Sequence, residues 1–158
     1  MRRAVCLFVV AFEQSHKIEG VSEPLLLTVP RKSGKNGIIS GKVETSESDF
    51  TAMLRELAEE IGWKPKKGAI FLASPIVVVC KHDSTGEEFQ CQYYMVRDSD
   101  LEEDPKANPE FQGNWMKVQD YLGQSPWKEQ DLSSFAILMA RFTESVISES
   151  RPPVHCLH

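Results

Sequence analysis

The 158-residue sequence has no apolar run long enough to cross a membrane. Its first twelve residues, MRRAVCLFVVAF, imitate a signal peptide, since two arginines precede an apolar stretch. No small-residue cleavage site follows, because Ala11 is succeeded by Phe12 and Glu13. We expect this stretch to be a strand that is buried on both faces. The sequence therefore predicts a cytoplasmic protein without a membrane partner.

The sequence also lacks the cysteine patterns of disulfide frameworks and zinc sites. Its four cysteines form no CxxC pair, so we expect free thiols in a reducing compartment. An excess of basic residues is missing too, and the formal net charge is −5. Proteins that bind duplex nucleic acid neutralise its phosphates with Lys and Arg. A duplex nucleic acid partner is therefore not expected, whereas a small phosphorylated ligand is compatible with this charge.

Internal repeats and low-complexity tracts are absent, and the composition is that of an ordinary globular protein. We expect a single domain over residues 1–150 and a flexible tail over 151–158. Apolar patterns predict strands over residues 3–12, 25–29, 38–39, 69–80, 88–96 and 114–119. Helical patterns cover 49–61 and 127–147, and loops are expected over 13–22 and 98–108. This order predicts an α/β fold with helices on both faces of a mixed β-sheet. Pro75 predicts a bulge or an edge position in its strand.

The most informative region spans residues 41–63, GKVETSESDFTAMLRELAEEIGW. Its apolar side chains recur at intervals of three and four residues, which predicts an amphipathic helix with one buried stripe. The stripe contains Phe50, Met53, Leu54, Leu57 and Ile61. Ser48 is the expected N-cap, and Gly62 is expected to end the helix because glycine tolerates positive φ.

The opposite face of this helix is acidic. At 100° per residue, Glu56, Glu59 and Glu60 lie within roughly a 100° arc. Carboxylates this close repel one another unless a cation lies among them. Hard oxygen ligands on one face suit Mg²⁺ or Mn²⁺, which usually share their coordination shell with substrate phosphates. Arg55 is expected to pair with Glu59 one turn later or with Glu47 before the helix.

The same region resembles the signature box of the Nudix hydrolases at every defined position. The pattern reads Gly41, five residues, Glu47, seven residues, then Arg55-Glu56-Leu57-x-Glu59-Glu60-x-Gly62-Trp63. The resemblance implies the α/β/α sandwich of that family and a divalent metal held by Glu56, Glu59 and Glu60. It implies that Gly41, Glu47 and Gly62 build the box and that Arg55 supports catalysis.

The chain departs from the family pattern at two serines, one just before the box and one just before Glu47. Members of the family often have glycine where this chain has Ser40 and Ser46. The backbone carbonyl at the Ser40 position is often a metal ligand in the family, so it is expected to be one here. A glutamate outside the box often acts as the base, commonly shortly before a tryptophan such as Trp115. Glu110 is the first choice for this base, and Glu59, Glu60, Glu87, Glu88 and Glu103 are alternatives.

Two further segments are expected to contact the substrate. The loop RKSGKNG contains Arg31, Lys32 and Lys35, whose charges suit substrate phosphates, and a solvated turn is the alternative interpretation. Trp127 and Asp131 resemble the tryptophan and acidic residues that read the base in nucleotide-pool sanitising members of the family. For Asp131, helix capping is the alternative role.

The predicted reaction is metal-dependent hydrolysis of a phosphoanhydride in a nucleoside diphosphate linked to another group. The first substrate hypothesis is a nucleoside triphosphate, oxidised or not, which yields a monophosphate and pyrophosphate. The second is ADP-ribose, a dinucleoside polyphosphate or a nucleotide sugar. A non-catalytic nucleotide-binding module is a third interpretation, although such modules typically lose box carboxylates that this chain retains. A homodimer, which many relatives form, and RNA 5′-end processing are also left open.

Overall fold

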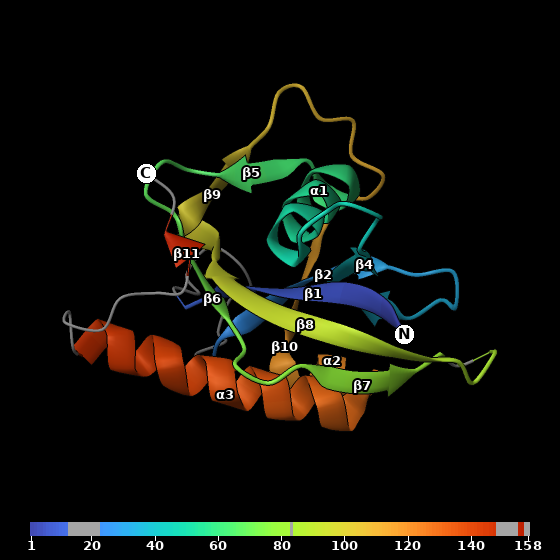
Figure 1. Ribbon diagram of the computed structural model, residues 1–158. Coiled ribbons are helices and arrows are strands. Elements are labelled where there is room, and N and C mark those ends of the chain that lie inside the picture. Colours follow the sequence, from blue (N-terminus) through green and yellow to red (C-terminus); the bar gives the residue numbers. More distant parts are fainter. Residues whose placement is uncertain (13–22, 83, 148–154, 157–158) are drawn as a thin grey trace.

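A nine-stranded mixed sheet forms the centre of the computed structural model, which describes residues 1–12, 23–82, 84–147 and 155–156 (Figure 1). Its strands are β1 (Arg2–Ala11), β2 (Leu25–Pro30), β3 (Asn36–Gly37), β4 (Ile39–Lys42), β6 (Ile70–Ala73), β7 (Val78–Lys81), β8 (Glu88–Arg97), β10 (Asn114–Lys117) and β11 (His155–Cys156). The path through the sheet is β10-β2-β1-β8-β6-β11, while β3, β4 and β7 pair with β2, β1 and β8. Strands β1 and β8 run parallel, and the other pairs of this sheet are antiparallel.

Helices cover both faces of this sheet. They are α1 (Asp49–Ile61) on one face and α3 (Lys128–Ile147) on the other, with the short α2 (Val118–Leu122) next to α3 (Figure 1). Successive residues of β1 point to opposite faces. Leu7 and Val9 therefore pack in the core beneath α1, whereas Phe8 and Val10 pack in the core beneath α3. The predicted α/β/α sandwich is confirmed.

Helix α1 forms where the sequence predicts it and is capped as expected. Ser48 accepts a hydrogen bond from the backbone N–H of Thr51 at 3.1 Å, and Gly62 ends the helix with φ of 71°. Within the predicted apolar stripe, Met53, Leu57 and Ile61 are buried, and the other two residues are partly buried against the same core. The acidic face is thus left pointing away from this core.

The loop before α1 contains a residue in the left-handed region of φ. Ser46 has φ of 69°, a conformation in which the Cβ of an L-residue costs about 1–2 kcal/mol. Glycine adopts this conformation without that cost. The loop backbone therefore has the shape that a glycine favours, although the chain carries serine here.

Ser46→Gly is expected to raise the free energy of unfolding by about 0.5 kcal/mol, because relief of strain outweighs the greater freedom of glycine in the unfolded chain. Urea denaturation measures the change. Thr45→Gly is the matched control, since Thr45 does not have positive φ, and it should destabilise the protein. A Ser46→Gly protein less stable than wild type would show that the conformation carries no strain.

Two predicted strands differ from those observed. The segment expected as one strand over 69–80 forms two, β6 and β7, which both pair with β8 on either side of a break at residues 74–77. Pro75 lies in this break, because proline has no N–H to donate to the ladder. The strand expected over 114–119 ends at Lys117, where α2 begins.

Two segments expected to be irregular contain regular structure. The predicted loop over 98–108 begins with the 3₁₀ turn η1 (Asp98–Asp100) and β9 (Leu101–Glu103), which pairs with β5 (Trp63–Pro65). Leu101 is buried, so a single apolar side chain anchors this short strand. Within the expected tail over 151–158, His155–Cys156 form β11, which pairs with β6. The predicted loop over 13–22 lies outside the described residues.

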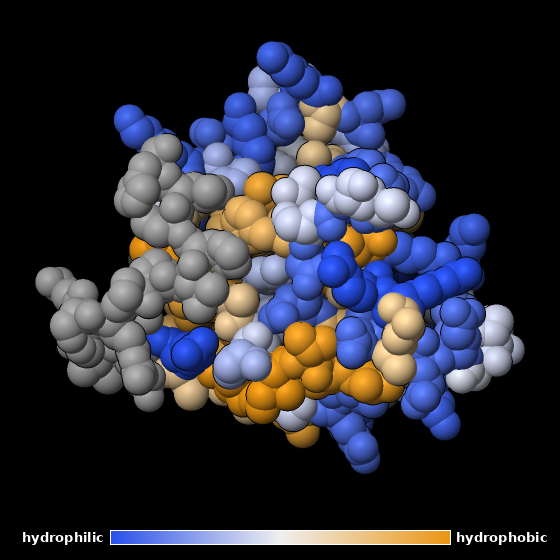
Figure 2. All heavy atoms as spheres, in the orientation of Figure 1, coloured by the Kyte–Doolittle hydropathy of each residue, from blue (hydrophilic) through white to orange (hydrophobic). Residues whose placement is uncertain are grey.

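Some large apolar side chains stay exposed near β7 and α3, where orange spheres gather near the bottom of Figure 2. They are Ile76, Val77, Val79 and Leu132. The outer edge of β7 is nevertheless covered, because the carbonyl of Lys81 accepts from Trp127 Nε1 at 2.7 Å and that of Val79 accepts from Gln130 Nε2 at 3.3 Å. None of the described helices has the length and apolar character needed to span a membrane.

Candidate active site

A groove of about 890 Å³ brings together residues from distant parts of the chain. It lies between the second half of α1, the loop after β2 and the start of α3. Its lining includes the acidic residues Glu56, Glu60 and Glu110, the basic residues Arg31, Lys32 and Lys35, and the aromatic residues Phe111, Tyr121 and Trp127. The volume is in the range of small-molecule sites. Most of the residues predicted to act in catalysis or substrate binding therefore share one cavity.

Arg55 connects several parts of the box through its hydrogen bonds. Its guanidinium donates to both carboxylate oxygens of Glu47, at 2.8 and 3.0 Å, and to Glu56 at 2.8 Å. It also reaches Glu59 at 3.4 Å and the backbone carbonyl of Lys42 at 2.9 Å. Both predicted partners of Arg55, Glu47 and Glu59, are confirmed. The Arg55 guanidinium lowers the pKa of Glu47 to about 2, so this pair is held at neutral pH.

Glu56 occupies a space that Gly41 leaves free. A Cβ added to Gly41 would lie 2.1 Å from the carboxyl group of Glu56, so any side chain here would displace Glu56 from its position. Burial raises the pKa of Glu56, while Arg55 opposes this shift. The glycine at the start of the box is therefore required by the packing of the Glu56 carboxylate rather than by its own φ.

Glu60 is almost fully buried and pairs with Arg31. The Arg31 guanidinium donates to Glu60 Oε1 at 3.1 Å and also contacts Ser40 Oγ at 3.1 Å and the carbonyl of Ile38. The backbone N–H of Ser40 donates to the same carboxylate at 3.4 Å. Burial nevertheless raises the pKa of Glu60 to about 7. Arg31, predicted to meet substrate phosphates, is thus bound to the acidic face of α1.

These carboxylates fit a hard divalent cation. Glu56 and Glu60 both line the groove, and their raised pKa values show that the arginines beside them do not fully offset the cost of burying charge. Glu59 differs, since its side chain is 57% exposed and contacts Arg55 outside the groove lining. Among the described residues, no three acidic, His or Cys side chains converge on one point. Arg31 holds Glu60, and Arg55 holds Glu56 and Glu59, so these carboxylates are each paired with an arginine.

Glu110 reaches the groove through contacts with the end of α1. The backbone N–H groups of Glu110 and Phe111 donate to the carbonyls of Glu59 and Glu60, each at 2.8 Å. They thereby satisfy carbonyls that the helix leaves without partners. Of the alternatives outside the box, Glu103 and Glu88 are not in the groove lining, and Glu87 pairs with Arg2 at 3.4 Å. The role of Glu110 as a base stays a prediction.

The other predicted substrate contacts fall into two groups. Lys32 and Lys35 are exposed on the groove, so their ammonium groups are open to a ligand. Trp127 is held by two contacts. Its Nε1 donates to the carbonyl of Lys81, and its ring packs edge-on against the ring of Phe89, with 5.7 Å between the ring centroids. Trp127 therefore presents a ring of fixed orientation to the groove.

Asp131 does not cap α3, so that alternative is wrong. It lies inside the helix, 1% exposed, and accepts hydrogen bonds from the hydroxyls of Tyr93, Tyr121 and Ser125. The Ser125 and Tyr121 bonds measure 2.6 and 2.7 Å. Asp131 contributes to the groove wall, but its carboxylate holds three elements of the α3 side together. Its role in reading a base stays a prediction.

Asp131→Ala is expected to lower the free energy of unfolding by about 2 kcal/mol, because three buried or partly buried hydroxyls lose their acceptor. Thermal and urea denaturation measure the loss. Ser125→Ala, which removes one donor and keeps the carboxylate, is the matched control and should cost about 1 kcal/mol. Equal stability of Asp131→Ala and wild type would mean that the network contributes nothing.

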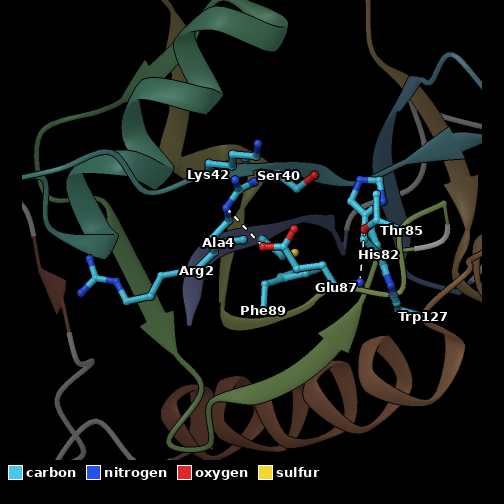
Figure 3. A pocket seen from close by; sticks show the side chains of 12 residues that line it. Arg2, Ala4, Ser40, Lys42, His82, Thr85, Glu87, Phe89 and Trp127 are labelled. Carbon is cyan, nitrogen blue, oxygen red and sulfur yellow. Dashed lines mark hydrogen bonds and ion pairs between the residues drawn. The ribbon is translucent and has the colours of Figure 1, made fainter.

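A smaller chamber of about 240 Å³ continues from the groove, and the two share Cys6, Ser40, His82 and Trp127. Figure 3 shows Ser40 and Lys42 on one side of this side chamber and His82, Thr85 and Trp127 on another. Lys42 makes no ion pair with any residue in the described part of the chain. Sequence analysis missed the groove and chamber residues Cys6, His82, Phe89 and Tyr121, because no spacing marks them and only the tertiary fold brings them together.

An α/β/α sandwich whose groove combines helix carboxylates with a basic loop is typical of enzymes that bind phosphorylated substrates through a divalent metal. The NUDIX domain family model matches residues 2–136, so the chain belongs to the Nudix family. This family match identifies it as a Nudix hydrolase, a class that generally needs a divalent metal ion and acts on small-molecule nucleotides. A comparison with curated proteins gives no match.

Three solved structures illustrate this similarity. A MutT structure from work on Aliivibrio salmonicida and Vibrio cholerae is 25% identical, with a TM-score of 0.51 and coverage of 82% of this chain and 90% of that chain. The Ap4A hydrolase of C. elegans is 14% identical, with a TM-score of 0.56 and coverage of 89% and 99%. The NUDIX domain of Shewanella oneidensis NrtR, complexed with ADP ribose, is 17% identical, with a TM-score of 0.60 and coverage of 89% and 87%.

Proposed function

We propose that this Nudix hydrolase uses Mg²⁺ or Mn²⁺ to cleave a phosphoanhydride in a nucleoside diphosphate linked to another group. A nucleoside triphosphate, oxidised or not, is the first substrate candidate, with a monophosphate and pyrophosphate as products. One observation carries the proposal: the box carboxylates Glu56 and Glu60 and the cationic loop lie in the same groove. Opposite charges in one cavity suit a phosphate chain that is shared between a metal and basic side chains.

The residues would divide the work as follows. Glu56, Glu59 and Glu60 would hold the metal, together with the carbonyl of Ser40. A bound divalent ion lowers the pKa of a water ligand and offsets charge on the diphosphate. Lys32 and Lys35 would bind the phosphates that extend into the groove, and Arg31 would join them. Glu110, or Glu59 or Glu60, would accept a proton from the attacking water.

The base of the nucleotide would lie against Trp127. Aromatic faces stack on planar rings, and the ring of Trp127 is held in place by Lys81 and Phe89. Asp131 and Tyr121 line the groove nearby, but the Tyr121 hydroxyl donates its proton to Asp131. Few polar atoms on this wall are therefore available to the base. This arrangement supports stacking as the main source of affinity for the base.

The side chamber favours a second candidate. A substrate with an organic group on each side of the diphosphate, such as ADP-ribose, a dinucleoside polyphosphate or a nucleotide sugar, would extend from the groove into this chamber. Phe89 and Trp127 offer apolar contacts there, and Lys42 offers a positive charge. The similarities to an Ap4A hydrolase and to a NUDIX domain complexed with ADP ribose support this candidate.

Product analysis separates the candidates. The purified protein is incubated with Mg²⁺ or Mn²⁺ and a panel of nucleoside triphosphates and nucleotide conjugates, with EDTA as the negative control. Pyrophosphate release identifies the first class, and two phosphorylated products without pyrophosphate identify the second. Glu59→Gln should lower turnover of the active substrate by orders of magnitude without unfolding the protein. Tight nucleotide binding without any hydrolysis would instead indicate a non-catalytic binding module.

The cellular setting is also part of this proposal. Cys6, Cys80 and Cys91 are buried free thiols, which supports a reducing compartment such as the cytoplasm. A homodimer stays a prediction, and sedimentation at several protein concentrations tests it.

A further inference from the structure

The Arg31 guanidinium forms an ion pair with Glu60, the carboxylate that the proposed function assigns as a metal ligand. Its Nη1 lies 3.1 Å from Glu60 Oε1, and its Nη2 lies 3.5 Å from Oε2. The Arg31 side chain is 30% exposed and that of Glu60 only 5% exposed, so the pair is formed at the buried end of the groove. Both oxygens of Glu60 therefore face the same guanidinium.

The surrounding chain is built to hold Arg31 in this position. A Cβ on Gly37 would lie 2.6 Å from Arg31 Nε and 3.1 Å from its Cγ, so the absence of a side chain at Gly37 opens the path to Glu60. Ser40 Oγ and the carbonyl of Ile38 accept from the other end of the guanidinium. Arg31 also closes the basic loop, since its backbone accepts from Gly34 at 2.9 Å and donates to Lys35 at 2.8 Å.

Lys32 and Lys35 have the same formal charge but a different position. They line the same groove, yet they are exposed and neither makes an ion pair with Glu60 or any other described residue. They add positive potential to the groove without occupying a carboxylate. The loop thus contains one cation bound to the acidic face and two that are open to ligands.

We propose that Arg31 is an internal counter-cation that competes with a divalent metal for Glu60, and that metal binding releases Arg31 and loosens the loop 31–37. The inference rests on the proposed function, because it takes Glu60 as a metal ligand. A divalent ion bound to a carboxylate oxygen would repel a guanidinium held against the same carboxylate. The exchange turns Arg31 from a structural partner into a side chain that is free to contact substrate phosphates.

Calorimetric titration of Mn²⁺ into the nucleotide-free protein tests the competition. Arg31→Met should bind Mn²⁺ about tenfold more tightly than wild type, as expected when one charge-assisted hydrogen-bonded pair no longer has to be broken. Lys32→Met and Lys35→Met are matched controls that remove the same charge from the same loop, and they should change the affinity by less than about threefold.

Gly37→Ala gives an independent variant that keeps the charge of Arg31. The added methyl group would push the flexible guanidinium away from Glu60, so this variant should also bind Mn²⁺ more tightly than wild type. Circular dichroism checks that each variant is folded. Affinity of Arg31→Met equal to that of Lys32→Met, or weaker, would overturn the inference while leaving metal binding intact. Failure of the wild-type protein to bind Mn²⁺ would overturn the metal assignment itself, so the two failures are distinguishable.

Hydrogen exchange tests whether metal binding loosens the loop 31–37, which a metal affinity does not report. In wild type, saturating Mn²⁺ should speed amide exchange in the peptide covering residues 31–37, because the loop loses its anchor on Glu60. In Arg31→Met this peptide should already exchange fast and should not respond to Mn²⁺. Slower exchange in wild type on adding Mn²⁺ would contradict release of the loop.

Discussion

Glu60→Gln is expected to lower kcat about 10³-fold, which corresponds to about 4 kcal/mol of lost transition-state stabilisation. Glutamine has nearly the same shape and keeps an oxygen that accepts from Arg31, so the groove should stay intact. The negative charge that a divalent cation needs is lost. Steady-state hydrolysis at saturating metal, with product release followed directly, measures this change.

The control for Glu60→Gln is Glu102→Gln, which makes the same chemical change on the exposed strand β9, outside the groove. It should leave turnover within about twofold of wild type. The free energy of unfolding of Glu60→Gln should stay within about 1 kcal/mol of wild type, because one buried charge is removed but its hydrogen bond is kept. Retention of most activity in Glu60→Gln would remove this carboxylate from the catalytic machinery.

Arg55→Met is expected to lower both stability and turnover. Its guanidinium joins Glu47, Glu56 and the carbonyl of Lys42, so its loss leaves partly buried acceptors without donors. We expect the free energy of unfolding to fall by about 3 kcal/mol, after allowing for the part of these groups that solvent reaches. Turnover should fall about 10²-fold, because Glu56 is no longer held in place. Urea denaturation and steady-state kinetics measure the two effects.

Arg55→Lys is the matched control, since it keeps the positive charge but not the planar fork. A lysine ammonium cannot bind both oxygens of Glu47 and reach Glu56 at once, so this variant should recover only part of each loss. Equal behaviour of the two variants would mean that the geometry of the fork, and not charge, supports the box, whereas full recovery in Arg55→Lys would mean that charge alone suffices. Wild-type stability in both would exclude a structural role for Arg55.

The same pair predicts how stability depends on pH. Arg55 lowers the pKa of Glu47 from its usual value of 4.5 to about 2 in the folded protein. The unfolded chain therefore binds a proton at higher pH than the folded one. The stabilisation from this pair is fully present above pH 4.5 and is lost as the pH falls towards 2. In Arg55→Met this part of the acid-induced loss should disappear, which urea denaturation at pH 5 and pH 3 would show.

Much of α1 could be read directly from the sequence because its information is local. The apolar stripe, the Ser48 cap and the Gly62 stop all depend on residues within one or two helical turns of each other. The pairing of Arg55 with Glu47 and Glu59 was predictable for the same reason. The alternation of buried residues in β1 likewise follows from a period of two.

The errors concern segments whose structure depends on distant partners. Strand β9 has only three residues, and it forms because β5 lies beside it. The break between β6 and β7 depends on how both pair with β8, which Pro75 alone does not specify. Asp131 has the residue type of a helix cap, but it lies inside α3, where Tyr93 and Tyr121 reach it from other elements.

The sequence by itself determined the family, the acidic face of α1 and the sandwich architecture, because these follow from short-range spacing and from patterns of burial. Only the tertiary structure decided that Glu110 joins Glu56 and Glu60 in one groove, and that Arg31 turns back onto Glu60 instead of remaining in solvent. These residues are 29 to 54 positions apart in the chain, as with the ion pair of Arg31 and Glu60 or with Glu56 and Glu110, which line one groove. Their geometry is set by the packing of whole elements, and no local spacing in the sequence encodes it.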